Sequence, residues 1–278
     1  MKKLVLAMFF ATVSVFAKVN VVVSILPEET FVKKIGGEHV VVTTMVQPGS
    51  EPHSYEPKPS QMKMLSKADV YFAIGVGFEK SWLDKFKAQN PKLSIVDVSK
   101  GIKRVKMVGH HHERDNEHEI LDPHVWLSPS NAKIIAKNIY DELVKLDSKN
   151  RADYEKGYEG LISQIDKTNK EVKNILKSLK PNTKFLIFHP AWGYFAKEYG
   201  LIQVPIEQEG KEPKPKELVK LINQARKDKE KVVITEPEFS DKSAKLIAEE
   251  LGIKVVKFSP LNPDWFDNLI NMAKAIAK

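Results

Sequence analysis

The sequence contains no cysteine among its 278 residues. Without thiols the chain cannot form a disulfide scaffold, a zinc ribbon or a thiolate nucleophile, and it offers no cysteine for a lipid anchor. It also lacks any run of Lys and Arg interleaved with aromatic residues, although its formal net charge is +8. We therefore expect no binding to nucleic acid.

The amino-acid composition is not that of a disordered or a fibrous protein. Hydrophobic residues make up 42% of the chain and charged residues 29%, which is the balance of a globular protein. A chain of this length can bury a large core as one large domain or two of ordinary size.

Long apolar runs are also absent, except at the N-terminus. Two lysines precede the apolar residues 4–16, which are fewer than the ~20 that a membrane-spanning helix needs. Val15 and Ala17 occupy the −3 and −1 positions of a cleavage site. We predict that residues 1–17 are a cleaved signal peptide, rather than a buried first helix, and that the mature protein is periplasmic without a lipid anchor.

Apolar runs typical of strands alternate with helical segments in both halves of the chain. The expected strands are 19–24, 40–46, 70–74 and 94–98, then 184–188, 201–206, 231–235 and 254–258. This alternation indicates βαβ units and parallel sheets. The tetrapeptide Glu-Pro-Lys-Pro occurs at 56–59 and again at 212–215, each time before a predicted helix. The repeated order predicts an α/β fold with two similar lobes.

The segment between the lobes has a helical pattern without the Gly and Ser of a flexible linker. At ~1.5 Å per residue, residues 152–179 would form a rod of roughly 42 Å. Asp147 and Ser148 are expected N-caps, and Pro181 ends the run. We predict an N-terminal lobe of residues 18–146, a stiff connecting helix of 147–180 that restricts hinge motion, and a C-terminal lobe of 181–278.

Three of the eight histidines lie next to proline or one residue from it, in separate segments. His53 is in the loop after the second strand, His124 is in an Asp-Pro-His-Val-Trp segment, and His189 follows the strand 184–188. Ligands of open α/β sheets gather at the carboxyl ends of strands, and imidazoles fixed by separate segments suit a metal ion. For each histidine alone a structural role is the more common one, and no His-Glu-x-x-His motif or helical His pair supports a metal site.

A polar segment precedes His124. Residues 110–119 contain four histidines, four acids and no apolar residue. Short tracts of this kind are typical of weak metal capture, and a solvated loop is the alternative. We expect this His-rich loop, 110–118, to raise the local metal concentration or to bind a second, weaker ion. His39, beside Glu38, is expected on the surface.

Three motifs together resemble those of metal-binding proteins that serve bacterial ABC importers, and most closely the zinc-specific branch. They are Pro-Gly-Ser-x-Pro-His-x-Tyr-Glu-Pro at 48–57, Asp-Pro-His-x-Trp at 122–126 and Phe-His-Pro-Ala-Trp-Gly-Tyr at 188–194. The resemblance implies two α/β lobes joined by a rigid helix, with metal in the cleft between them. It carries the ligand positions over to His53, His124 and His189. It also implies Zn²⁺ as the transported ligand, an inner-membrane ABC permease as partner, and a monomer.

The fourth ligand has no clear counterpart. Manganese members of the family carry Glu at the third ligand position and an Asp near the last strand, whereas this chain has His189 and no Asp in 258–261. Water, Glu51 and Asp264 are the candidates. Three neutral imidazoles suit zinc, while manganese prefers carboxylate and water oxygens.

We therefore predict a high-affinity zinc-binding periplasmic component of an ABC importer, and not an enzyme. A manganese or iron carrier of the same transporter class is the first alternative. The second is a zinc hydrolase or lyase, because three His and one water also form a catalytic zinc site. Such an enzyme would need a general base, for which Glu51, Glu236 and Glu238 are candidates.

Overall fold

The computed structural model describes residues 18–108, 121–208 and 210–278. The predicted signal peptide 1–17 and the His-rich loop 110–118 lie outside these residues. Within them, no helix combines the length and the hydropathy that crossing a bilayer requires.

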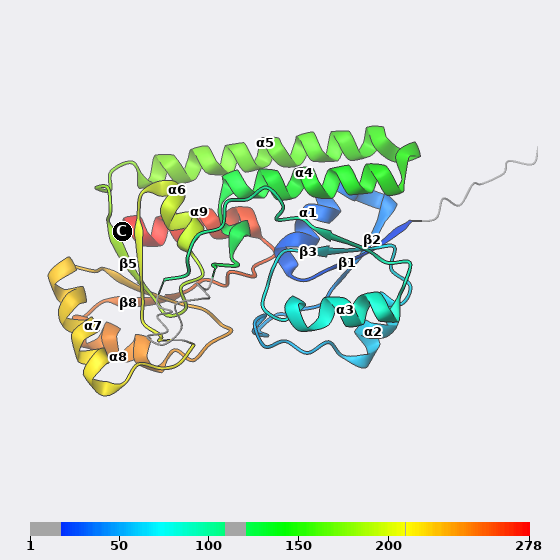
Figure 1. The fold of residues 1–278 in the computed structure, drawn as a ribbon. Helices are drawn as coiled ribbons and strands as arrows, with labels where there is room; N and C mark the ends of the chain where they lie inside the picture. The colour runs from blue at the N-terminus through cyan, green and yellow to red at the C-terminus, as the bar shows by residue number, and fades with distance from the viewer. Residues whose placement is uncertain (1–17, 109–120, 209) are drawn as a thin grey trace, which may run out of the picture.

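Two four-stranded parallel sheets form the cores of two lobes that lie side by side (Figure 1). The N-terminal sheet has the order β2-β1-β3-β4 and consists of β1 (Val19–Val23), β2 (Val40–Thr44), β3 (Val70–Ala73) and β4 (Ser94–Asp97). The C-terminal sheet has the equivalent order β6-β5-β7-β8 and consists of β5 (Lys184–Ile187), β6 (Ile202–Pro205), β7 (Val232–Thr235) and β8 (Lys254–Lys257). The predicted α/β fold with two similar lobes is confirmed.

Helices cover the sheets and bridge the lobes. Those of the N-terminal part are α1 (Leu26–Gly36), α2 (Pro59–Leu65), α3 (Glu79–Gln89) and α4 (Pro129–Leu146). The long helix is α5 (Arg151–Leu176), and α6 (Gly193–Tyr199), α7 (Pro215–Asp228), α8 (Lys242–Leu251) and α9 (Trp265–Ala277) follow. Helices α4 and α5 run beside each other at the top of Figure 1, where α5 extends over both lobes and α4 lies over the N-terminal lobe.

The long helix covers most of the predicted 152–179, but it begins after the N-caps expected at Asp147 and Ser148. A 3₁₀ turn occupies Ser148–Asn150, and α5 starts at Arg151. Asp147 does not cap the helix; its carboxylate accepts hydrogen bonds from Tyr154 Oη (2.8 Å) and Asn150 Nδ2 (2.6 Å). The lobe boundaries at 146 and 181 stay a prediction.

One buried apolar cluster runs through both lobes. It joins the strands of the N-terminal sheet to α1, α4 and α5, and it continues into β5 and α9. Trp126 Nε1 donates to the Pro260 carbonyl (2.8 Å), and Trp265 Nε1 donates to the Trp126 carbonyl (2.8 Å). A second cluster lies under α7 and α8. The lobes are therefore connected by a shared core as well as by α5.

Two glycines of α5 provide a matched test of its packing. A Cβ on Gly157 would lie 2.5 Å from the Ile35 carbonyl oxygen, whereas a Cβ on Gly160 would meet nothing within 4 Å. Alanine is favoured over glycine by about 1 kcal/mol inside a helix, but crowding a packed contact costs about 1–3 kcal/mol. We expect Gly160→Ala to raise the melting temperature and Gly157→Ala to lower it. Equal shifts in thermal denaturation would contradict close packing of α5 on α1.

Candidate metal centre

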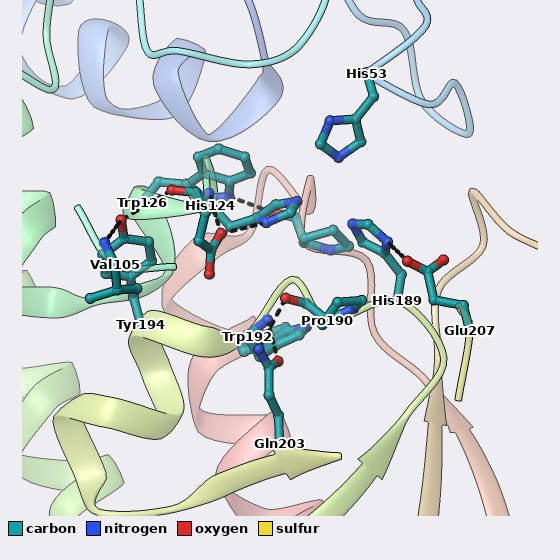
Figure 2. A network of polar contacts seen from close by, with 12 residues as sticks. His53, Val105, His124, Trp126, His189, Pro190, Trp192, Tyr194, Gln203 and Glu207 are labelled. Carbon is teal, nitrogen blue, oxygen red and sulfur yellow. Dashed lines mark hydrogen bonds and ion pairs between the residues drawn. The ribbon is translucent and has the colours of Figure 1, made fainter. Parts of the chain in front are cut away.

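The three candidate histidines converge between the lobes (Figure 2). Their ring centroids are 5.6 Å apart for His53 and His124, 5.4 Å for His53 and His189, and 5.2 Å for His124 and His189. One ring nitrogen from each lies within 4.8 Å of the other two. Among the described residues this is the only group of three or more potential ligands found within that distance.

Local structure holds each histidine in place. His53 lies in the loop between β2 and α2, where the Glu51 carboxylate accepts from the backbone N–H of His53 (2.6 Å) and of Ser54 (2.9 Å). His124 precedes the buried 3₁₀ turn Val125–Leu127. His189 follows β5, at the carboxyl end of the sheet, where parallel-sheet proteins place their ligands.

Buried carboxylates orient two of the imidazoles. Asp122 Oδ1 lies 2.8 Å from His124 Nδ1, and Glu207 Oε1 lies 2.9 Å from His189 Nδ1. An ionised carboxylate can only accept, so each pair places the proton on Nδ1 and leaves Nε2 as the metal-binding nitrogen. The dashed contact from His189 to Glu207 in Figure 2 shows this arrangement.

Neither Asp122 nor Glu207 is among the site residues predicted from the sequence. Asp122 lies two residues before His124 in the Asp-Pro-His motif, so a local signal for it was present. Glu207 follows β6 and reaches His189 from 18 residues away in the chain. No local pattern marks that pair, because the contact exists only where β5 and β6 lie side by side.

Burial and mutual repulsion set the protonation of the centre. The pKa of His53 is lowered to about 4, chiefly by burial and then by the neighbouring rings of His124 and His189. The pKa of Asp122 is raised to about 7 because burial disfavours its charged form. A neutral His53 at neutral pH has a lone pair ready for a cation. A divalent ion in the centre would in turn favour the ionised form of Asp122.

A pocket of about 440 Å³ adjoins the cluster, and its lining includes His53, His189, Glu51 and Phe239. The Phe239 ring stacks on His189 with centroids 4.5 Å apart and an interplanar angle of 21°. The pocket meets the histidines on the side of His53, whose side chain is 33% exposed. His124 and His189 are almost fully buried.

The candidates for a fourth ligand differ in position. Glu51 lines the pocket, and its Oε1 lies 3.8 Å from His53 Nε2. Asp264 is an exposed N-cap of α9 and does not line this pocket. Glu236 and Glu238, the other candidate bases, are also absent from its described lining. Glu236 instead accepts from the backbone N–H of His189 (3.2 Å).

His39 takes no part in this centre. Its Nε2 lies 2.9 Å from Asp153 Oδ2, and its ring meets Tyr154 edge-on with centroids 5.8 Å apart. It is half-buried between α1 and α5 rather than fully exposed.

Known proteins that resemble this chain belong to one family of metal-binding proteins. The model of the zinc-uptake complex component A, periplasmic, matches residues 21–278. The zinc-binding protein AdcA of Streptococcus pyogenes is 30% identical over 262 residues, covering 88% of this chain and 50% of AdcA. The high-affinity zinc uptake system protein ZnuA of Bacillus subtilis is 34% identical over 247 residues, covering 85% of this chain and 76% of ZnuA.

A manganese-transport relative also matches: the substrate-binding lipoprotein PsaA of Streptococcus anginosus is 28% identical, covering 80% of this chain and 74% of PsaA. Among solved structures, a crystal structure of ZnuA superposes with a TM-score of 0.86 at 41% identity, covering 94% of this chain and 98% of that one. The chain spans about half the length of AdcA.

Proposed function

Because this chain belongs to the family of periplasmic zinc-uptake component A proteins, we propose that it captures Zn²⁺ and delivers it to an inner-membrane ABC permease. The observation that carries this proposal is the convergence of His53, His124 and His189 within ligand reach of one another. We assign these three residues as the zinc ligands.

The donor set favours zinc over manganese. Three imidazole nitrogens suit Zn²⁺, whereas Mn²⁺ prefers carboxylate and water oxygens. With Zn–N bonds of about 2.0–2.1 Å, tetrahedral ligand nitrogens lie about 3.4 Å apart, so the rings need only a small inward shift from their present spacing. Asp122 and Glu207 supply the outer hydrogen bonds that fix ring orientation at zinc sites. A manganese or iron carrier of the same class remains the alternative.

We assign the fourth position to Glu51 or to water. Glu51 and Glu207 both line the pocket; Glu207 is bound to His189 Nδ1, whereas Glu51 lies beside His53, where a carboxylate would offset one charge of the ion. The exposed position of Asp264 disfavours it as a ligand.

Transport rather than catalysis fits the family. We propose a monomer that works outside the cytoplasm and carries no reaction centre of its own. A hydrolase would need a base facing the open coordination position. Of the three acids considered for that role, the described pocket lining includes Glu51 and lacks Glu236 and Glu238.

Titrating the mature apo-protein with Zn²⁺ in a large excess of Mn²⁺ tests the metal assignment. We expect one tight zinc equivalent that manganese does not displace, measured by calorimetry. Displacement of zinc by manganese would favour the alternative carrier. A second, weaker equivalent that disappears when residues 110–118 are deleted would support the role expected of the His-rich loop.

Zinc affinity should fall as the pH is lowered, because protons compete with the metal for imidazole nitrogens. The pKa of His53 is lowered to about 4, chiefly by burial, so this imidazole adds its proton only near pH 4. We therefore expect the dependence of log Kd on pH to steepen as the pH approaches 4. An affinity that is independent of pH would contradict an all-imidazole ligand set.

A further inference from the structure

His53 differs from the other two proposed ligands in how it is held. His124 and His189 are almost fully buried, and each ring is hydrogen-bonded by a carboxylate. Among the described residues, no carboxylate hydrogen-bonds the His53 ring: Glu51 Oε1 is 3.8 Å from its Nε2. The position of His53 must therefore be set mainly through its backbone.

The turn after β3 supports that backbone. A Cβ on Gly77 would lie 2.8 Å from His53 Cα and 2.9 Å from its carbonyl oxygen, so the two segments are in direct contact. Phe78 donates its backbone N–H to the Pro52 carbonyl (3.2 Å). The turn 74–78 is therefore in direct contact with the backbone that carries His53.

Glu79 holds this turn from the interior of the lobe. Its Oε1 accepts from the backbone N–H of Ile74 (3.0 Å), and its Oε2 accepts from that of Gly75 (2.8 Å). Gly75 has a φ of 93°, a left-handed conformation that favours glycine. Gly75 and Gly77 both line the metal pocket, so the Glu79 carboxylate shapes its wall from behind.

Burying the Glu79 carboxylate costs free energy, because it removes a polar group from water. Its side chain is 3% exposed, and burial raises its pKa. The Ser24 hydroxyl donates to Glu79 Oε1 (2.5 Å) and contacts Tyr71 Oη (2.6 Å), and these contacts complete a buried polar network. Removing one partner of such a network lowers the stability of the fold more than replacing the whole network by apolar groups, because a buried polar atom is left without a hydrogen bond.

We propose that Glu79 is a positioning residue for zinc binding: its carboxylate fixes the turn 74–78 and thereby sets the place of His53. Asp122 and Glu207 orient their histidines by direct hydrogen bonds. Glu79 positions His53 indirectly, through the backbone contacts of the turn 74–78. This inference rests on the proposed function, in which His53 is a zinc ligand.

Glu79→Gln is the informative variant. A glutamine has one acceptor oxygen, so it cannot accept from Ile74 and Gly75 on two oxygens as the carboxylate does. Loss of outer support at metal sites typically weakens binding by about 10- to 100-fold. We expect a loss in that range for zinc, measured by competition with a chromogenic chelator on protein shown to be folded by circular dichroism.

Glu142→Gln is the matched control. Glu142 is also buried in the N-terminal lobe, but it lies on α4, where it accepts from Ser94 Oγ (2.8 Å) and pairs with Lys145, away from the turn that contacts His53. The zinc affinity of this variant should stay within about 3-fold of the unmodified protein, as expected for a site that is not coupled to the ligands. If Glu79→Gln fails to fold, Ser24→Ala removes the hydroxyl that donates to Glu79 and contacts Tyr71, leaves both backbone bonds of Glu79 in place, and should give a smaller loss in the same direction.

A double-mutant cycle separates positioning from general destabilisation. If Glu79 acts through His53, Glu79→Gln should have almost no further effect on zinc affinity in a His53→Ala background. An equal loss in both backgrounds would overturn the inference, as would an unchanged affinity in Glu79→Gln alone. If the unmodified protein does not bind zinc, or if His53→Ala binds it normally, then the proposed function fails instead.

Discussion

Replacing His189 with alanine is expected to weaken zinc binding by about 100- to 1,000-fold. The free energy of zinc binding to sites with four ligands is about 10–16 kcal/mol, so one ligand contributes roughly 3–4 kcal/mol of it. At 1.4 kcal/mol for each tenfold change, the loss corresponds to about two to three orders of magnitude in Kd. The same reasoning applies to His124 and His53. Isothermal calorimetry with a competing chelator measures these changes.

His39→Ala is the control for these three variants. His39 pairs with Asp153 outside the cluster, so its removal should leave zinc affinity unchanged. Removal of His124 or His189 also leaves a buried carboxylate without its imidazole, and folding must therefore be checked at each measurement. Equal losses for all four variants would contradict the assignment of the centre.

Trp265→Ala should have the largest effect on stability. Trp265 is 1% exposed in α9, its ring meets Phe31 of α1 edge-on at 5.3 Å, and its Nε1 donates to the Trp126 carbonyl. Truncating a buried aromatic side chain costs about 3–5 kcal/mol, and here it also leaves the Trp126 carbonyl without its donor. We expect the free energy of unfolding in urea to fall by about that amount.

Trp82→Ala is the matched control for this variant. Trp82 is half-buried on α3, and Lys85 Nζ lies 4.2 Å from its ring centroid. Its loss should cost about 1 kcal/mol, as is usual for residues outside the core. If the two tryptophan variants lose the same stability, then α9 does not tie the lobes together as its contacts indicate.

The shared core bears on how far the lobes can move. Sequence analysis predicts one stiff helix as the connection, and the structure adds the α9 contacts and the Trp126–Pro260 hydrogen bond. Opening the cleft would have to break these buried contacts, which are costly to expose. The added connections strengthen the expectation of restricted hinge motion.

Local sequence patterns determined the strands and the fold class. The eight expected strands correspond to β1–β8 with differences of one or two residues at their ends, because short apolar runs bounded by turns carry their own signal. Helices α3, α4, α8 and α9 were not predicted. Ser128, whose Oγ accepts from the Asn131 N–H (3.2 Å), and Pro129 mark the start of α4, so its N-terminal signal was present in the sequence.

The three candidate ligands could also be named from the sequence, because each histidine lies in a short proline-containing motif that resembles a motif of the family. The distant residues that position these ligands could not be predicted from the sequence. Glu207 reaches His189 across two strands, and Glu79 reaches His53 through a turn and the backbone of another loop. Such partners are chosen by which segments the folded sheets bring together, and local residue patterns do not encode that pairing. The sequence thus determined the lobes, the imidazoles and the local Asp122–His124 motif, while only the tertiary structure decided which distant carboxylates lie against the other segments of the centre.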